Sequence, residues 1–311
     1  MLRSSLFTAV FAASVVVLAT ALSGCGQFSP AYMKPLSAQT RAQLANKGMS
    51  EEQPILIRIF KAESELEVWK QKLDGRYYHF KTYPICSYSG GLGPKLKQGD
   101  RQAPEGFYLV SFDQMNPRSK YHLAFNIGFP NAYDRAYGRT GADLMVHGDC
   151  TSSGCYAMTD AVMEEIYILA RVALSAGQSA FQVQAYPFRM TTAKMESHKG
   201  DKWYEFWRNL KEGYDYFEIS RLPPEIAVCE KRYLVNASFV AGDVRPDPAG
   251  ACPAYQRLPI PRAPAMQEAS AKTKQNYSSL SKPLGSVLGL TFGPSKPNYR
   301  AFTLGPATPG R

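Results

Sequence analysis

The sequence has few histidines, and its many basic residues are not gathered into the runs that nucleic-acid sites often contain. Only four histidines occur in 311 residues, and three of them, His79, His122 and His198, stand alone. The net charge is +10, yet no run of five or more basic residues occurs, and no RNA-binding aromatic motif or helix-turn-helix pattern is recognisable. A charge spread in this way fits an anionic cell-envelope environment and argues against a nucleic-acid partner.

A stop-transfer pattern is also missing after the apolar N-terminal stretch, which argues against a permanent membrane span. Residues 1–24 instead read as an export signal, with a basic start and an apolar segment over residues 6–21. The motif LSGC resembles a bacterial lipobox, so Cys25 is expected to become the acylated first residue. The residue after this cysteine, Gly26, resembles the residues found at that position in lipoproteins that are sorted to the outer membrane. We expect a periplasmic protein anchored by its lipid, with residues 25–52 as a tether.

Glycine and proline are plentiful, at 24 and 22 residues, and this favours strands and turns over a helix bundle. The segment PILIRIF, from Pro54 on, alternates with three isoleucines on one side, as a strand does. Similar segments follow at short spacing, and Asp74-Gly75 is a hairpin signal. Residues 88–106 are expected to form a long loop. The pattern predicts a mainly β (α+β) fold with flanking helices, an antiparallel sandwich or barrel.

Two helices are expected near this sheet structure. One follows Thr159 or Asp160 as N-cap and stops at Gly177, and the segment of Cys155 is expected to lead into it. The other lies within residues 200–213, with Asp201 as cap candidate. The expected domains are a catalytic domain over residues 53–190, an extension packed on it over residues 191–260, and a disordered tail over residues 261–311.

The stretch LMVHGDCTSSGCYAMTD, residues 144–160, places His147, Cys150 and Cys155 within nine positions. A zinc site would need further ligands, and no second cluster is evident. A disulfide could join Cys150 to Cys155, or Cys150 to Cys86. Cys229 and Cys252 are natural partners for each other. With Cys25 set aside, five cysteines remain, so at least one thiol is expected to be free.

Catalysis is the third possibility for this stretch. A helix N-terminus and a nearby imidazole would lower the pKa of a cysteine, and both are expected beside Cys155. Gly154 permits unusual backbone angles, and backbone N–H groups of the Ser153–Cys155 turn could face a developing oxyanion. His147 ends a short strand and suits a base. Cys155 is therefore the candidate nucleophile, and this chemistry needs no metal or other cofactor.

The pattern of His-Gly followed by Ser-x-Gly-Cys resembles the catalytic signature of the L,D-transpeptidase (YkuD-domain) family. Several further blocks between residues 53 and 190 resemble the YafK branch in the same order. The resemblance implies a β-sandwich-like fold with Cys155 as nucleophile, His147 as base, and Ser152, Ser153 and Gly154 around the oxyanion or substrate. Arg139 is a candidate for binding a substrate carboxylate.

The family resemblance also implies the reaction. The cysteine would attack the carbonyl at the L-centre of meso-diaminopimelate in a peptidoglycan stem peptide, and an amine or water would resolve the acyl-enzyme. Ser153 and Ala157 stand where the wider family has a histidine and an arginine, as in the YafK branch, which is associated with hydrolytic release of outer-membrane protein from peptidoglycan. The alternative is a peptidoglycan-binding lipoprotein that keeps the fold without turnover.

Overall fold

The computed structural model describes residues 30–242 and 244–263. The predicted signal peptide, the predicted lipidation site Cys25 and nearly all of the predicted tail lie outside the described residues. Within the described ranges, no helix combines the length and the apolar character that crossing a bilayer requires.

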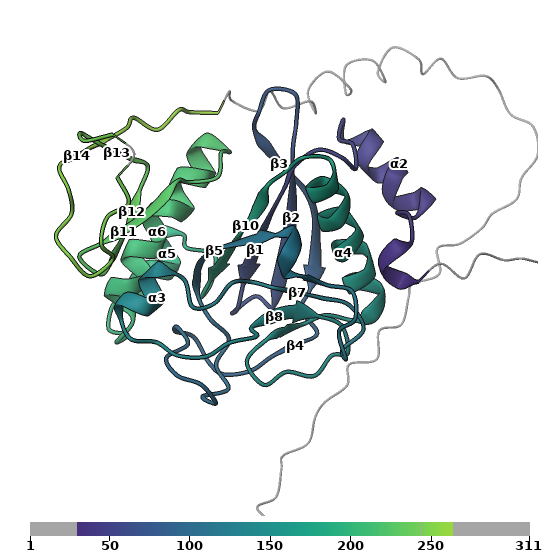
Figure 1. Cartoon of the computed structure of the whole chain (residues 1–311), viewed down its shortest axis with the longest axis horizontal. Helices are drawn as coiled ribbons and strands as arrows, with labels where there is room; N and C mark the ends of the chain where they lie inside the picture. The colour runs from purple at the N-terminus through teal and green to yellow at the C-terminus, as the bar shows by residue number, and fades with distance from the viewer. Residues whose placement is uncertain (1–29, 243, 264–311) are drawn as a thin grey trace, which may run out of the picture. The chain divides into compact units, whose positions relative to one another are not determined.

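The chain has a mixed α+β fold with two five-stranded sheets (Figure 1). The helices are η2 (Ala31–Met33), α2 (Ala38–Asn46), η3 (Phe112–Gln114), α3 (Ala132–Ala136), α4 (Asp160–Ser175), α5 (Thr192–Ser197) and α6 (Tyr204–Ser220). The strands are β1 (Ile55–Phe60), β2 (Glu65–Gln71), β3 (Tyr77–Pro84), β4 (Ser87–Tyr88), β5 (Gly106–Ser111), β6 (Met115–Asn116), β7 (Ala124–Asn126), β8 (Met145–His147), β9 (Tyr156–Ala157), β10 (Ala180–Tyr186), β11 (Ile226–Cys229), β12 (Arg232–Val235), β13 (Ala237–Phe239) and β14 (Tyr255–Arg257).

The first sheet has the order β3-β2-β1-β10-β5, and the second has the order β4-β9-β8-β7-β6. Each sheet is antiparallel except for one parallel pair, which is β1–β10 in the first sheet and β8–β9 in the second. The β2–β3 hairpin turns at Gly75, whose φ of 79° is readily adopted by glycine. The strand-rich prediction is confirmed in this coarse form, although helices take a larger share than the sequence pattern indicated.

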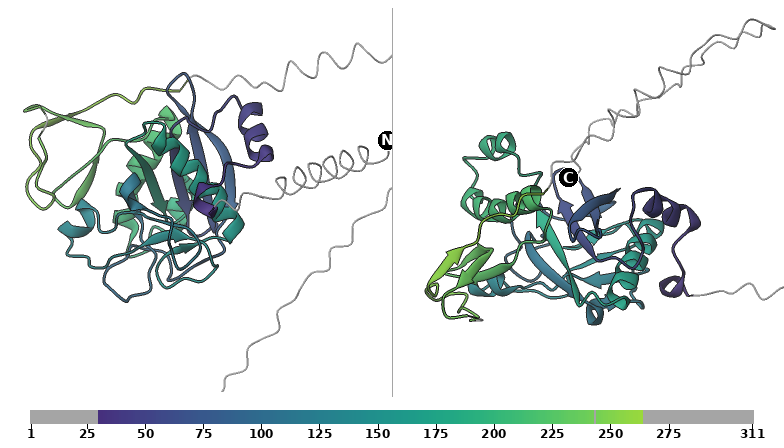
Figure 2. Two further views of the ribbon diagram at one scale, coloured as in Figure 1. Left: turned by 45° about the vertical axis from the view of Figure 1, so that its right-hand side comes forward. Right: turned by 90° about the horizontal axis from the view of Figure 1, so that it is seen from above.

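Both faces of the first sheet are buried, because different elements cover each one. Ile55, Ile57 and Ile59 lie on the face that joins the main core, together with α4 and the second sheet. Phe60 lies on the opposite face, among aromatic residues of α6. Figures 1 and 2 show α4 and α6 on opposite sides of this sheet. The alternating sequence pattern identified the first face, but it gave no indication that the second face is also covered.

Helix α4 matches its sequence signals. The Thr159 hydroxyl accepts a hydrogen bond from the backbone N–H of Val162, which is the expected N-cap interaction. The helix ends just before Gly177, which has a φ of 113°. Its apolar stripe, including Ile166, Leu169 and Ala173, is buried in the main core.

Two expectations about the helices need correction. Cys155 does not lead into α4, since strand β9 and the cap residue Thr159 intervene. Helix α6 begins after Trp203 and runs to Ser220, and Asp201 accepts a hydrogen bond from the Trp203 N–H without capping the helix. The C-terminal extension also contains two hairpins, β11–β12 and β13–β14.

The described part of the predicted tether, residues 30–52, packs on the domain. Leu36 and Leu44 are each 2% exposed and belong to the main core. The Lys34 ammonium lies 3.0 Å from a carboxylate oxygen of Glu164 on α4. This segment is therefore part of the folded unit, because its apolar side chains complete the core beside α4.

Candidate active site

The parallel pair β8–β9 places His147 and Cys155 on one face of the second sheet. Val146 pairs with Tyr156, and both side chains are fully buried in the main core. Side chains alternate between the two faces of a strand, so the neighbouring His147 and Cys155 project to the opposite face. The pairing of β8 with β9 thereby fixes the position of His147 relative to Cys155.

His147 and Cys155 line the same cavity, which has a volume of about 580 Å³. The Tyr121 ring lies against the imidazole of His147, with ring centres 4.9 Å apart. The remaining lining residues are Lys95, Gln98, Gly99, Arg101, Ala142, Asp143, Leu144, Thr151, Ser152, Ser153 and Gly154. The cavity therefore unites the predicted motif with the long loop before β5.

The hydrogen bond of His147 defines which of its nitrogens can act as a base. Nδ1 contacts the backbone carbonyl oxygen of Gly148. A carbonyl oxygen can only accept, so Nδ1 carries the proton and Nε2 keeps its lone pair. Burial lowers the pKa of His147, which favours the neutral ring. The imidazole is thus in the protonation state that a general base requires.

Cys155 has a free thiol that is partly buried. Its Sγ accepts a hydrogen bond from the Met145 N–H at 3.4 Å and donates one to the Asp143 carbonyl oxygen at 3.6 Å. Burial raises the pKa of this thiol. The expectation of a helix N-terminus that lowers this pKa is wrong, because α4 begins five residues later. The resting residue is a thiol that a base must deprotonate.

The other described cysteines form two disulfides, Cys86–Cys150 and Cys229–Cys252. The first joins the turn before Cys155 to the short segment between β3 and β4. Since the sulfur of Cys150 is used in this bond, it is not available as a zinc ligand. Among the described residues, no group of three or more His, Cys, Asp or Glu side chains is arranged to hold a metal ion.

The turn that precedes Cys155 is held by its own hydrogen bonds. The Ser152 hydroxyl donates to the Cys155 carbonyl oxygen at 2.7 Å and accepts from the Gly154 N–H at 3.3 Å. Gly154 has a φ of 137°, a value that side-chain-bearing residues rarely adopt. Ser153 is exposed at the cavity rim. The Gly154 N–H is thus already hydrogen-bonded to Ser152. The Ser152 side chain therefore stabilises the turn.

Arg139 does not lie at this cavity, so its predicted role needs correction. Its guanidinium lies 2.8 Å from the carboxylate of Asp134, and both side chains are buried. The arginine lines a separate cavity beside α6. His122 is likewise engaged elsewhere, with Nε2 2.9 Å from a carboxylate oxygen of Glu164. The position of Arg139 in the loop before the motif did not predict where its side chain lies. The side chain is oriented by its ion pair with Asp134, five residues earlier.

Sequence reasoning did not identify the residues that the long loop brings to the cavity. Lys95 is buried and ion-paired with Asp100, whose other oxygen accepts the backbone N–H groups of Leu96 and Lys97. Arg101 also lines the cavity, and no carboxylate partner for it is found within the described ranges. The available signal was the length of the loop, since long structured loops in compact domains are often functional.

No protein-family model matches the chain. Among solved structures, the helical cell shape determining protein Pgp2 from Campylobacter jejuni is 19% identical and aligns with a TM-score of 0.36, over 57% of this chain and 67% of that one. Bd1075 of Bdellovibrio bacteriovorus is 18% identical, with a TM-score of 0.31, over 52% of this chain and 59% of that one.

Sequence comparison gives a much stronger match. The Escherichia coli K12 protein named "Putative L,D-transpeptidase YafK" is 45% identical over 236 residues, which covers 74% of this chain and 93% of that protein. The protein of the same name from Escherichia coli O157:H7 matches to the same extent. On this identity and coverage, the chain belongs to the L,D-transpeptidase (YkuD-domain) family, in its YafK-like branch.

Proposed function

We propose that the protein is a cysteine acyltransferase or hydrolase that acts on diaminopimelate-containing stem peptides of peptidoglycan. The observation that carries the proposal is the shared face of β8 and β9, where a free thiol and a neutral imidazole line one cavity. The family relationship supports the substrate class. Neither step of the proposed chemistry needs a cofactor.

In the proposed reaction, Nε2 of His147 removes the thiol proton as Sγ of Cys155 attacks the carbonyl carbon of the scissile amide. The resulting tetrahedral intermediate collapses, the C–N bond breaks, and the imidazolium gives its proton to the leaving amine. A thioester remains on Cys155. Water or a second amine then attacks this thioester with His147 as base, and the thiol is regenerated. Water gives hydrolysis and an amine gives transfer.

Arg101 is the residue we propose for binding a substrate carboxylate in this cavity. It lines the cavity and is exposed, and no carboxylate within the described ranges is paired with it. Lys95 is less suitable because Asp100 already neutralises its charge. An arginine can bind a carboxylate through two parallel hydrogen bonds, which would orient a stem peptide. Arg101 thus takes the role that the sequence assigned to Arg139.

The proposed site of action is the periplasm, with attachment to the outer membrane through an acylated Cys25. This part rests on the N-terminal sequence alone, where an apolar segment precedes the lipobox-like motif. Release of an outer-membrane protein from peptidoglycan is the specific hydrolytic outcome that we favour. Globomycin treatment, which blocks lipoprotein signal cleavage, should leave the longer precursor if the cysteine is processed.

The direct test compares the parent protein with Cys155→Ser on purified sacculi that carry linked protein. We expect the parent to release protein or form transfer products, identified by mass, and the variant to lose at least about 10³-fold in rate. Lys72→Ala is the control, because Lys72 lines neither the cavity of Cys155 nor the cavity beside α6. Full activity of Cys155→Ser would contradict the proposal.

A carbapenem distinguishes the enzyme from a binding protein of the same fold. An acylating cysteine should add the mass of the β-lactam to the parent chain and not to Cys155→Ser. Sacculus binding without any covalent adduct or product would support the non-catalytic alternative.

A further inference from the structure

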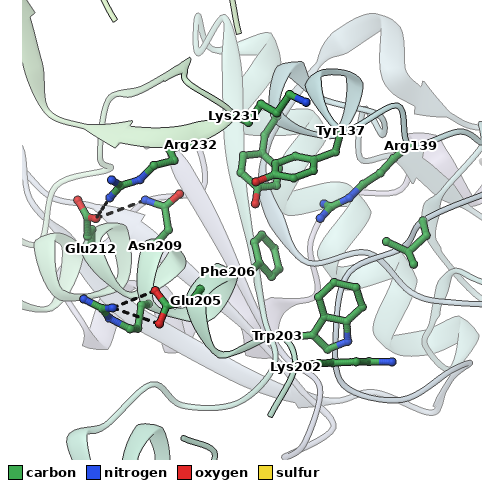
Figure 3. Close-up of a pocket in the computed structure, with 13 residues that line it drawn as sticks. Tyr137, Arg139, Lys202, Trp203, Glu205, Phe206, Asn209, Glu212, Lys231 and Arg232 are labelled. Atoms are coloured by element: carbon green, nitrogen blue, oxygen red, sulfur yellow. Dashed lines mark hydrogen bonds and ion pairs between the residues drawn. The ribbon is translucent and has the colours of Figure 1, made fainter. Parts of the chain in front are cut away.

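A second cavity, of about 830 Å³, lies between α6, the β11–β12 turn and the segment around α3. We call it the aromatic groove, defined by Tyr133, Tyr137, Lys202, Trp203, Phe206 and Lys231. Figure 3 shows the rings of Tyr137, Phe206 and Trp203 between the side chains of Lys231 and Lys202. Aromatic faces flanked by cations form a surface that is both apolar and positively charged.

The floor of the aromatic groove is rigid. The Arg139 guanidinium lies over the rings of Tyr133 and Phe206, at 5.0 and 5.2 Å from their centres, and is held by Asp134. Tyr133 stacks on Tyr233 with ring centres 4.3 Å apart. These contacts fix the rings of Tyr133 and Phe206 before any ligand arrives, so binding would not need to order these two side chains.

The two lysines of the groove have no carboxylate partner among the described residues. Lys202 lies over the Trp203 ring at 5.2 Å, and Lys231 lies over the Tyr137 ring at 5.7 Å. The two acidic residues that line the groove are paired with arginines: Glu205 pairs with Arg208, and Glu212 pairs with both Arg232 and Arg257. The groove therefore has uncompensated positive charge at two points, which complements a ligand with separated carboxylates.

Lys231 is held in place by the hairpin that presents it. Its own N–H donates to the Pro248 carbonyl oxygen, and the N–H of Glu230 donates to that of Gly250. The Cys229–Cys252 disulfide closes the same turn. The backbone that carries the Lys231 side chain is therefore fixed. This residue belongs to the C-terminal extension, outside the expected catalytic domain.

Only two short segments separate the aromatic groove from the cavity of Cys155. Leu96 lines the groove, whereas the adjacent Lys95 lines the cavity. The Thr140 N–H donates to the Leu96 carbonyl oxygen at 3.2 Å, and the Ala142 N–H donates to Gln98 at 3.2 Å. An extended ligand that passes over these two segments would contact both the aromatic groove and the cavity of Cys155.

We propose that the aromatic groove is a second binding site for a carboxylate-bearing stem peptide, separate from the site of acyl transfer. This inference rests on the proposed function for the identity of the ligand. The stem peptide is chosen over a neutral glycan because the free charges of the groove call for carboxylates. Lys202 and Lys231 would bind these groups while the peptide backbone lies on the rings of Trp203 and Tyr137.

The test measures binding in a Cys155→Ser background, so that it does not depend on turnover. Trp203 is the one tryptophan of three that lines the groove, which makes its fluorescence a local probe. The ligands are a soluble diaminopimelate-containing tetrapeptide, glycan strands stripped of peptides by an amidase, and polyglutamate. We expect Lys202→Ala/Lys231→Ala to weaken tetrapeptide binding by about tenfold, because two exposed ion pairs are lost.

The matched control is Lys47→Ala/Lys72→Ala. These lysines also lie over aromatic rings, of Phe80 and Tyr78, and line neither cavity. The control removes the same charge and should bind the tetrapeptide as the parent does. Trp203→Phe should abolish the fluorescence change.

Three results would overturn this inference: equal tetrapeptide affinity in the groove variant and the control, lysine-dependent binding of bare glycan strands instead, or equally tight binding of polyglutamate. Failure of the proposed function would give a different result. The parent protein would then show no turnover on sacculi, while tetrapeptide binding would still depend on Lys202 and Lys231.

Discussion

The protonation states of Cys155 and His147 decide which kind of cysteine chemistry is available to the resting protein. Burial raises the pKa of the thiol and lowers the pKa of the imidazole. Each shift favours the neutral form, so the neutral pair is favoured over a thiolate–imidazolium pair. Proton transfer then accompanies attack on the substrate, with His147 acting as general base.

This assignment predicts the pH dependence of thiol alkylation. The rate with iodoacetamide follows the thiolate fraction, so its midpoint should lie above the ordinary thiol pKa of 9.0. Turnover should instead rise through the pKa of His147, below the ordinary 6.5, because acid protonates Nε2 and removes the base. His147→Gln should leave the alkylation midpoint nearly unchanged. A midpoint below pH 7 in the parent would indicate a preformed ion pair and contradict the assignment.

The contrast between Arg101 and Arg139 gives a second prediction for single residues. Arg101→Gln should raise KM about tenfold with little change in kcat, because it removes ground-state binding of a carboxylate. Arg139→Gln should instead lower the free energy of unfolding by about 3 kcal/mol, because the buried Asp134 loses its partner. Steady-state kinetics and urea unfolding of both variants separate the two roles. An unchanged KM for Arg101→Gln would exclude it from substrate binding.

At the scale of elements, a buried ion pair joins the first sheet to the long loop and to α6. Lys61, just after β1, lies 3.0 Å from Glu105, and both side chains are completely buried. The other carboxylate oxygen of Glu105 accepts the indole N–H of Trp207 at 2.8 Å. The Lys61 ammonium also donates to the carbonyl oxygens of Gly93 and Ala103. These contacts fix both ends of the loop that supplies Lys95 and Arg101 to the cavity.

Removal of one charge from this network should be much more damaging than removal of an exposed one. Lys61→Met leaves the Glu105 carboxylate buried without a cation, and we expect a loss of about 3–5 kcal/mol in urea unfolding. Lys81→Met, which breaks the more exposed pair with Glu165, should cost less than about 1 kcal/mol. Adding Glu105→Gln to Lys61→Met should recover part of the loss. Equal effects of Lys61→Met and Lys81→Met would mean that the buried pair contributes no more than a surface pair.

Local signals in the sequence predicted the elements that depend on neighbouring residues, and non-local pairing decided the rest. Thr159 and Gly177 delimit α4 because capping and helix termination are local properties. The position of Cys155 beside β9 depends on pairing with β8, and no periodicity in two residues can show that. The buried pair Lys61–Glu105 spans 44 positions, and neither residue has a pattern that indicates burial.

At the scale of the whole described molecule, the C-terminal extension completes the fold. Trp207, Leu210 and Phe217 of α6 are fully buried. They belong to the clusters that contain Phe60 and Leu56 on the outer face of β1. The sequence placed this extension next to the domain, but it could not indicate that the central strand needs it, since β1 reads as a strand with one buried face. The extension also supplies Trp203 and Lys231 to the aromatic groove.

A truncation tests this dependence. A chain that ends at residue 190 exposes the outer face of the first sheet, including Phe60 and Tyr186, which are both fully buried in the complete fold. We expect it to aggregate, because a contiguous apolar surface of this kind is not tolerated in water. A chain that ends at Ala263 keeps the described contacts and should unfold cooperatively at the Tm of the parent. If the shorter chain gave a soluble protein with native near-ultraviolet circular dichroism and an alkylatable Cys155, the extension would be an accessory to an independent catalytic domain. Aggregation only of the shorter chain would show that the sheet and the extension fold as one unit.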